Sequence, residues 1–169
     1  MKSVVVLAMH GAPPRDFPRG EMQEYFQLQA REDQPPPAGG HSSRFKELEA
    51  RMRVFPRNET NDPFWKGSRE LAAALEKACG LPVLLGFNEF CAPSLDEIFD
   101  RAAAEGAKKI VVVTPMMTRG GEHAENDIPA SIDRARRRHP GLTFLYAWPF
   151  QTKDVAGFLA KKIRELAGK

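Results

Sequence analysis

The sequence predicts an α/β protein in which a parallel sheet of about four strands carries helices on both faces. Four apolar runs, at residues 3–9, 82–87, 109–114 and 142–148, have the length and composition of buried strands. Segments with helical spacing lie between these runs, and such connections join parallel neighbours. The run at 109–114 is β-branched and apolar on both faces, as expected of a central parallel strand.

The first strand, at 3–9, is followed by a long connection and then by a helix that returns to the sheet. Asp62 and Pro63 mark the start of this helix, because Asp caps helix N-termini and Pro fits the first turn. Apolar residues at helical spacing continue to Gly80, which is typical of a helix C-terminus. The second strand, at 82–87, follows directly.

The second half of the chain repeats this alternation of strand and helix. Ser94 and Glu97 form the pattern of a capping box, and Gly106 ends that helix. After the strand at 109–114, a further helix is expected to open at Asn126 or Asp127, with Ile128, Ile132 and Ala135 inward and Pro140-Gly141 at its end. The strand at 142–148 then precedes a final amphipathic helix with the apolar stripe Val155, Phe158, Leu159, Ile163 and Leu166.

The connection at residues 11–61 is far longer than a typical strand–helix loop. It contains two stretches with helical character, at 21–31 and 43–54, on either side of a Pro- and Gly-rich run at 35–40. A long loop at the ligand edge of a sheet is typical of a lid or binding loop, and a partly disordered insertion fits nearly as well. We therefore expect a single domain over residues 1–169 with an insertion at 11–61.

Composition and charge argue against several functional classes. A formal charge of +3, from 25 cations and 22 anions, is too small to indicate a nucleic-acid partner. The apolar N-terminal run has no small-residue cleavage site and is too short to span a bilayer, so neither export nor a membrane is expected. Cys79 and Cys91 lack metal-site spacing, which indicates reduced thiols and a cytoplasmic location.

Three residues with metal-binding chemistry follow three of the expected strands. His10 ends the first strand, Glu89 follows the second, and His123 lies a few residues beyond the third. The carboxyl ends of parallel strands share one edge of the sheet, where ligands bind, so these side chains are expected to converge. Two imidazoles and a carboxylate suit a borderline divalent ion such as cobalt, iron, nickel or zinc. Three ligands with open positions describe a catalytic or transfer site.

Each of these residues also has a structural interpretation. A lone histidine is more often structural than functional, and Glu89 could serve as a capping carboxylate. The acids beside His123 could orient a ring nitrogen, although Glu125 and Asp127 are also explained as acids at a helix start. A nucleotide site is disfavoured, because no Gly-rich phosphate loop follows the first strand.

Three segments together resemble the small sirohydrochlorin cobaltochelatase/ferrochelatase family, single-domain relatives of the class II tetrapyrrole chelatases. They are Asn-Glu-Phe-Cys-Ala-Pro-Ser-Leu at 88–95, the strand at 109–115, and the run at 120–129 with its Gly-x-His and Asp-Ile-Pro elements. The resemblance covers residues 83 to about 150 and the first strand with its terminal His10-Gly11. It implies a three-layer, flavodoxin-like chelatase fold.

The resemblance also implies an activity and a site. Members insert a divalent metal, cobalt or ferrous iron, into sirohydrochlorin without ATP, in tetrapyrrole biosynthesis of the cobalamin and siroheme type. The family's two active-site histidines match His10 and His123, and its acidic residue matches Glu89. The histidines would contact the metal and accept protons, while Glu89 would transfer a proton or orient a ligand. The metal is then a substrate, no tightly bound cofactor is implied, and a homodimer is expected.

This chain departs from the family pattern beside the first histidine. His10 follows Met9 and precedes Gly11-Ala12, where members have a Gly before the histidine and Ser-Arg after the Gly. The departure supports one alternative, a non-catalytic carrier of metal or tetrapyrrole. Another alternative is a chelatase for a different macrocycle, either protoporphyrin or a nickel tetrapyrrole.

The insertion is expected to act on the macrocycle rather than on the chemistry. Removing it should weaken tetrapyrrole affinity, whereas shortening it between Asp33 and Ser42 should leave metal affinity nearly unchanged. The equally good alternative is that its aromatic residues anchor the insertion to the core or to a second subunit. The side chains with suitable chemistry are Phe17, Tyr25, Phe26 and Phe45 for ring contacts and Arg15, Arg19 and Arg44 for carboxylates.

Overall fold

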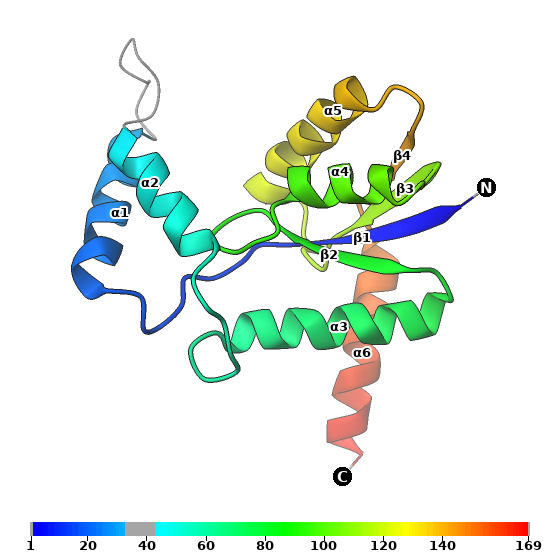
Figure 1. Ribbon diagram of the computed structural model, residues 1–169. Helices are drawn as coiled ribbons and strands as arrows, with labels where there is room; N and C mark the ends of the chain where they lie inside the picture. The colour runs from blue at the N-terminus through cyan, green and yellow to red at the C-terminus, as the bar shows by residue number, and fades with distance from the viewer. Residues whose placement is uncertain (1, 33–42, 169) are drawn as a thin grey trace.

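The computed structural model of the protein describes residues 2–32 and 43–168 (Figure 1). Among the described helices, none has both the length and the apolar character needed to cross a membrane. The elements in chain order are β1 (Ser3–Met9), α1 (Arg19–Glu32), α2 (Ser43–Arg53), α3 (Pro63–Cys79), β2 (Val83–Phe87), α4 (Leu95–Ala104), β3 (Lys109–Val113), η1 (His123–Asp127), α5 (Ile128–Arg138), β4 (Thr143–Tyr146) and α6 (Thr152–Ala167).

The four strands form one parallel sheet in the order β2-β1-β3-β4, which confirms the expected sheet. In this register Met9 lies beside Phe87, and Leu7 lies beside Val113. All four strands therefore end at the same edge. The residues that follow β1, β2 and β3 begin from neighbouring positions at that edge.

Helices cover both faces of the sheet (Figure 1). On one face, α4 and α5 bury a core that includes Val6, Ile98, Phe99, Ile110 and Ile132. On the other face, α3 packs over Leu7, Met9 and Phe87. The expected helix signals are confirmed: Asp62 caps α3, Ser94 and Glu97 form a capping box on α4, and Gly80 adopts a left-handed conformation after α3.

The insertion folds as a helix pair, α1 and α2, which lies beyond the carboxyl end of β1 (Figure 1). Its apolar residues pack around Phe90, from the loop after β2, and Phe17, Tyr25 and Phe45 are buried in this cluster. Their burial matches the anchoring interpretation, while Phe26 is 42% exposed. Arg44 donates to Glu24 across the helix pair, and this hydrogen bond lowers the pKa of Glu24. The Pro- and Gly-rich run and the proposed shortening lie outside the described residues.

One element differs from expectation. The helix expected to open at Asn126 or Asp127 begins earlier, because the π-helical turn η1 starts at His123 and continues into α5. A π turn carries one more residue than an α turn, so helical spacing does not reveal it. The final helix forms as expected, but its apolar stripe is not covered: Phe158 is 61% exposed and Ile163 is 64% exposed.

Candidate metal site

The structure brings His10, Glu89 and His123 together at the carboxyl edge of the sheet. One possible ligand atom from each residue can be chosen so that all three atoms lie within 4.8 Å of one another. An ion held at about 2.1 Å by nitrogen and oxygen ligands spaces them by roughly 3–3.5 Å. Small side-chain rotations would therefore bring all three ligands to one ion. The three side chains are 25–36% exposed, which leaves a path for a ligand from solvent.

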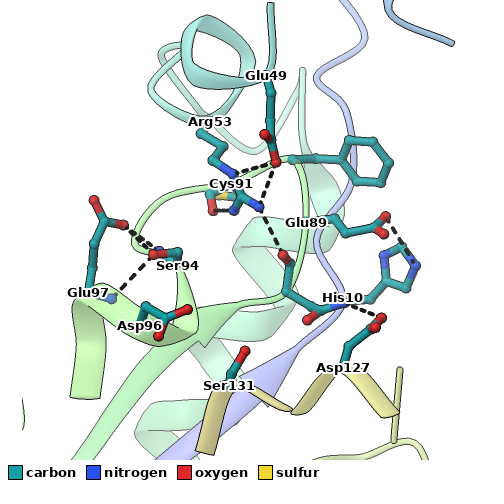
Figure 2. A network of polar contacts seen from close by, with 12 residues as sticks. His10, Glu49, Arg53, Glu89, Cys91, Ser94, Asp96, Glu97, Asp127 and Ser131 are labelled. Atoms are coloured by element: carbon teal, nitrogen blue, oxygen red, sulfur yellow. Dashed lines mark hydrogen bonds and ion pairs between the residues drawn. The ribbon is translucent and has the colours of Figure 1, made fainter. Parts of the chain in front are cut away.

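The ring of His10 is oriented by its own backbone. Its Nδ1 lies 2.8 Å from the carbonyl oxygen of Gly11. Because a carbonyl oxygen can only accept a hydrogen bond, Nδ1 is the donor and carries the hydrogen. The lone pair is then on Nε2, which lies 3.9 Å from a carboxylate oxygen of Glu89 (Figure 2). This geometry selects the tautomer that a metal ligand needs.

His123 is oriented in the same way by side chains. Its Nδ1 lies 2.5 Å from Oδ2 of Asp127, one turn later, and 2.9 Å from Nδ2 of Asn88. The Asp127 carboxylate makes the shorter contact and can only accept, so it favours the tautomer with the hydrogen on Nδ1 and the lone pair on Nε2. Asn88 Nδ2 donates to the same carboxylate oxygen at 3.0 Å. The two imidazole rings meet edge to face with centroids 4.2 Å apart. Both histidines thus have an oriented ring whose Nε2 carries the lone pair.

The chemistry of this set favours a divalent ion over an anion. Two imidazoles and the Glu89 carboxylate give a borderline-to-hard donor set with one negative charge. Asp127 adds a second carboxylate just behind His123, as is common for histidines that bind metals. Such a site can hold an ion with open coordination positions and can accept protons on the same ligands.

A cleft of about 520 Å³ opens beside Glu89 and Asp127, a volume within the range of small-molecule sites. It is bounded on one side by the insertion helices and on the other by the starts of α4 and α5. Its charged lining is mixed, with both carboxylates and guanidinium groups. Residues that line it away from the three ligands include Tyr25, Phe45, Glu49, Arg53, Asp96 and Arg134.

Sequence reasoning missed two contributors to the site. Asn88 entered only as part of the motif at 88–95, although its side chain bonds to Asp127, and Arg53 carried no local signal at all. His139 lies away from the site: it ends α5, and its Nε2 lies 2.6 Å from Oδ1 of Asp100. Cys91 is buried within its loop, and Cys79 is exposed.

Comparison with known proteins gives a family and two curated relatives. The family model described as CbiX matches residues 61–166. A sirohydrochlorin cobaltochelatase from Priestia megaterium is 34% identical over 70 residues, which cover 41% of this chain and 22% of that protein. A sirohydrochlorin cobaltochelatase from Sulfurisphaera tokodaii is 29% identical over 82 residues, which cover 48% of this chain and 64% of that protein. The chain therefore spans about a fifth of the first relative and under two thirds of the second.

Two solved structures share the fold. A CbiX protein from Marinobacter aquaeolei VT8 superposes with a TM-score of 0.53 at 20% identity, covering 99% of both chains. The structure of SirB from Bacillus subtilis with Fe³⁺ superposes with a TM-score of 0.55 at 20% identity and covers 98% of this chain but 48% of SirB. The three-layer chelatase fold implied by the motifs is thereby confirmed.

Proposed function

The chain belongs to the CbiX family, and from this membership we propose that it is a metallochelatase that inserts cobalt or ferrous iron into sirohydrochlorin without ATP. The observation that carries the proposal is the convergence of His10, Glu89 and His123 beside a cleft of ligand size. The substrate named for both curated relatives supports the same macrocycle. The reaction is that of a lyase in tetrapyrrole biosynthesis of the cobalamin or siroheme type.

The ligand set suits the exchange that insertion requires. The macrocycle gives up two pyrrole protons and takes the ion, while the ion loses its waters. A neutral imidazole can bind the ion through Nε2 and can accept a proton there once the ion has moved to the ring. We assign metal contact and proton acceptance to His10 and His123, and metal contact with proton transfer or ligand orientation to Glu89.

The metal is a substrate in this scheme, and the enzyme holds no tightly bound cofactor. Three protein ligands leave coordination positions for the ring nitrogens, whereas a closed four-ligand site would retain the ion. The exposed fractions of the three side chains, 25–36%, fit a site that exchanges its ion. The donor types suit several borderline metals, so the choice of metal depends on geometry and supply.

A homodimer is part of the proposal. The final helix α6 carries an amphipathic stripe without a cover, and its C-terminal half extends beyond the rest of the molecule in Figure 1. Apolar stripes of this kind mark interaction surfaces. This chain covers 48% of the SirB chain, so two copies of it would match the length of one SirB chain. A second copy is therefore the partner of suitable size and fold. The exposed residues are Phe158, Leu159, Ile163 and Leu166.

Two further assignments complete the proposal. Residues 1–169 act as one chelatase-like unit, with 11–61 as an insertion in it; the cluster that joins the insertion to Phe90 supports this. The protein acts in the cytoplasm, which the free thiols of Cys79 and Cys91 support, because thiols persist in reducing compartments.

Absorbance spectroscopy with sirohydrochlorin and Co²⁺ tests the activity. We expect many equivalents of metallated product per chain and a faster rate than without protein. His123→Ala should abolish this turnover while lowering the free energy of unfolding by less than about 1 kcal/mol, because a partly exposed edge residue adds little packing. Full activity in His123→Ala would remove the assigned role, and misfolding would support a structural one.

The same measurement separates the alternatives. A carrier would give at most one equivalent of spectral change per chain, whatever the incubation time. Parallel assays with ferrous iron and nickel, and with protoporphyrin in place of sirohydrochlorin, test the choice of metal and macrocycle. Faster turnover of protoporphyrin or of nickel would replace the proposed substrate pair with the alternative one.

A further inference from the structure

The loop at residues 88–91, which carries Glu89, is fastened from the β1 side by backbone contacts. Glu89 N donates to the carbonyl of His10 at 2.8 Å, and Asn88 N donates to that of Met9 at 2.8 Å. Gly11 adopts a positive φ of +100°, and a Cβ there would overlap the Glu89 carbonyl oxygen. These contacts fix where the loop leaves the sheet, but none of them reaches its far side.

The far side of the loop is held by two arginines of the insertion: Arg57 donates to the carbonyl of Phe90, and Arg53 donates to the carbonyls on either side of the Glu89-Phe90 pair. Arg53, the last residue of α2, donates from Nη2 to the carbonyl of Asn88 at 3.0 Å and from Nη1 to that of Cys91 at 3.3 Å. Its own carbonyl accepts from Ala92 N at 2.9 Å. The guanidinium therefore spans the two carbonyls that flank Glu89 and Phe90, while Glu89 points to His10 (Figure 2).

The loop needs such a clamp because its backbone is strained. Phe90 has a φ of +57°, a region that side chains other than glycine seldom adopt without support from their surroundings. Its ring is buried in the insertion's cluster. Arg53 is itself oriented by Glu49, whose carboxylate accepts from Nε and Nη2 at 3.3 and 3.1 Å. A planar guanidinium suits this task, since its donors diverge in a fixed plane.

We propose that Arg53 is a positioning residue for Glu89, so that the insertion sets the geometry of the metal site as well as bordering the cleft. The inference rests on the proposed chelatase function. Arg53 does not have to touch the metal or the macrocycle in this role. It acts by holding the carbonyls on either side of Glu89, and its loss allows the carboxylate to leave the position from which it reaches the ion.

The test compares Arg53→Met with a matched control on the same helix. Met keeps the length and the apolar stem but cannot donate. Arg51→Met removes an exposed arginine whose ion pair, to Glu21 on α1, lies away from the loop. We expect Arg53→Met to lower kcat for cobalt insertion about tenfold, as is common for groups that orient metal ligands, with an unchanged KM for sirohydrochlorin. Arg51→Met should match the wild type.

A double-mutant cycle with Glu89→Gln decides whether Arg53 acts through Glu89. If it does, adding Arg53→Met to Glu89→Gln should change turnover, and Co²⁺ affinity measured with a chelating dye, by less than about twofold. A further tenfold loss in that background, or a raised KM with unchanged kcat, would overturn the proposal and make Arg53 a macrocycle contact. If Glu89→Gln has no measurable turnover, the double-mutant cycle is calculated from the Co²⁺ affinities of the four proteins.

Two more results keep the outcomes separate. If Arg53→Met does not fold, Arg53→Lys takes its place, because it keeps the charge beside Glu49 but cannot span two carbonyls. Wild-type protein without turnover would count against the chelatase function, whereas the cycle on Co²⁺ affinity would still report on Arg53. An Arg53→Lys protein with wild-type kcat and Co²⁺ affinity would overturn the positioning role.

Discussion

At the scale of single residues, the candidate metal site depends on the atoms that fix the direction of each imidazole. His10 is oriented by a backbone carbonyl, which no side-chain substitution removes. His123 is oriented by Asp127, which a substitution can change. A substitution can therefore change the orientation of His123 but not that of His10. Substituting Asp127 tests whether the orientation of His123 matters for metal binding.

Asp127→Asn should lower Co²⁺ affinity and insertion rate about tenfold while retaining the fold. An Asn amide can present its NH₂ to Nδ1, which favours the tautomer with its hydrogen on Nε2 and removes the lone pair that binds the ion. Glu125→Gln is the matched control, because Glu125 lies on the same turn but accepts from Gly120 N rather than from His123. Equal activity of both variants would show that Asp127 is only a helix-start acid.

Burial gives the two cysteines different reactivity. Desolvation raises the pKa of the Cys91 thiol to about 11, so at pH 8 it is protonated as well as buried, while Cys79 is exposed. Because the thiolate is the reactive form, one thiol per native chain should react rapidly with a chromogenic disulfide, and two after unfolding. Rapid reaction of two thiols in native protein, or of one in Cys79→Ser, would contradict this environment for Cys91.

The convergence of the three candidate site residues was predictable from the sequence, as was an acid beside His123, but their partners from distant segments were not. His10 and Glu89 each come just after a strand, and the shared edge of a parallel sheet implies that they meet. The hydrogen bond from Asn88 to Asp127 joins residues 39 apart, and no local pattern encodes it. The same holds for Arg53, which is one of many arginines until the fold places it against the loop.

At the scale of elements, local signals located most helices and strands because their determinants are local. Capping by Asp62 and by Ser94 depends on residues within one turn, so both helix starts were readable. The insertion was harder, since its two helices were expected but not their shared core with Phe90. That core depends on a contact between segments far apart in the chain.

The junction between the insertion and α3 is secured by a buried ion pair. Arg57 and Asp62 side chains are 5% and 1% exposed, and Arg57 also donates to the carbonyls of Ala12, Met52 and Phe90. Removing one member of a buried pair leaves the other charge without a partner. Arg57 therefore joins the loop after β1, the end of α2 and the loop after β2.

Arg57→Met should lower the free energy of unfolding by about 3 kcal/mol, measured by urea denaturation. Asp62→Asn, which can still cap α3, should cost a similar amount, and the double variant should cost less than the sum. Arg69→Met is the control, because Arg69 lies over the Trp65 ring at the surface of α3. A change below about 1 kcal/mol in Arg57→Met would contradict the structural role of the pair.

At the scale of the whole molecule, the sequence indicates the apolar stripes of the helices but not which of them the rest of the chain covers. The stripes of α4 and α5 are buried, whereas that of α6 is exposed. Amphipathic spacing reports that a helix face avoids water, but not which molecule covers it. The proposed dimer accounts for the difference.

Sedimentation velocity should give twice the mass of one chain for the wild type. The variant Phe158→Ser/Ile163→Ser should sediment as a single chain, because it removes two of the largest exposed apolar side chains of α6. Leu71→Ser, at a site 41% exposed on α3, should stay dimeric. Wild-type protein that sediments as a single chain, or a double variant that remains paired, would remove α6 as the interface.

The π turn at η1 has a consequence for length variation in this region. The amide of Ile128 donates to the carbonyl of His123, five residues earlier, so the wide turn closes in five residues where an α turn closes in four. A chain with one residue fewer between His123 and Asp127 could close an ordinary α turn and keep Ile128 against the core. The acid behind the histidine would then follow it by three residues instead of four. Such a deletion would therefore keep the helix and its packing, but it would change the spacing on which the orientation of the histidine depends.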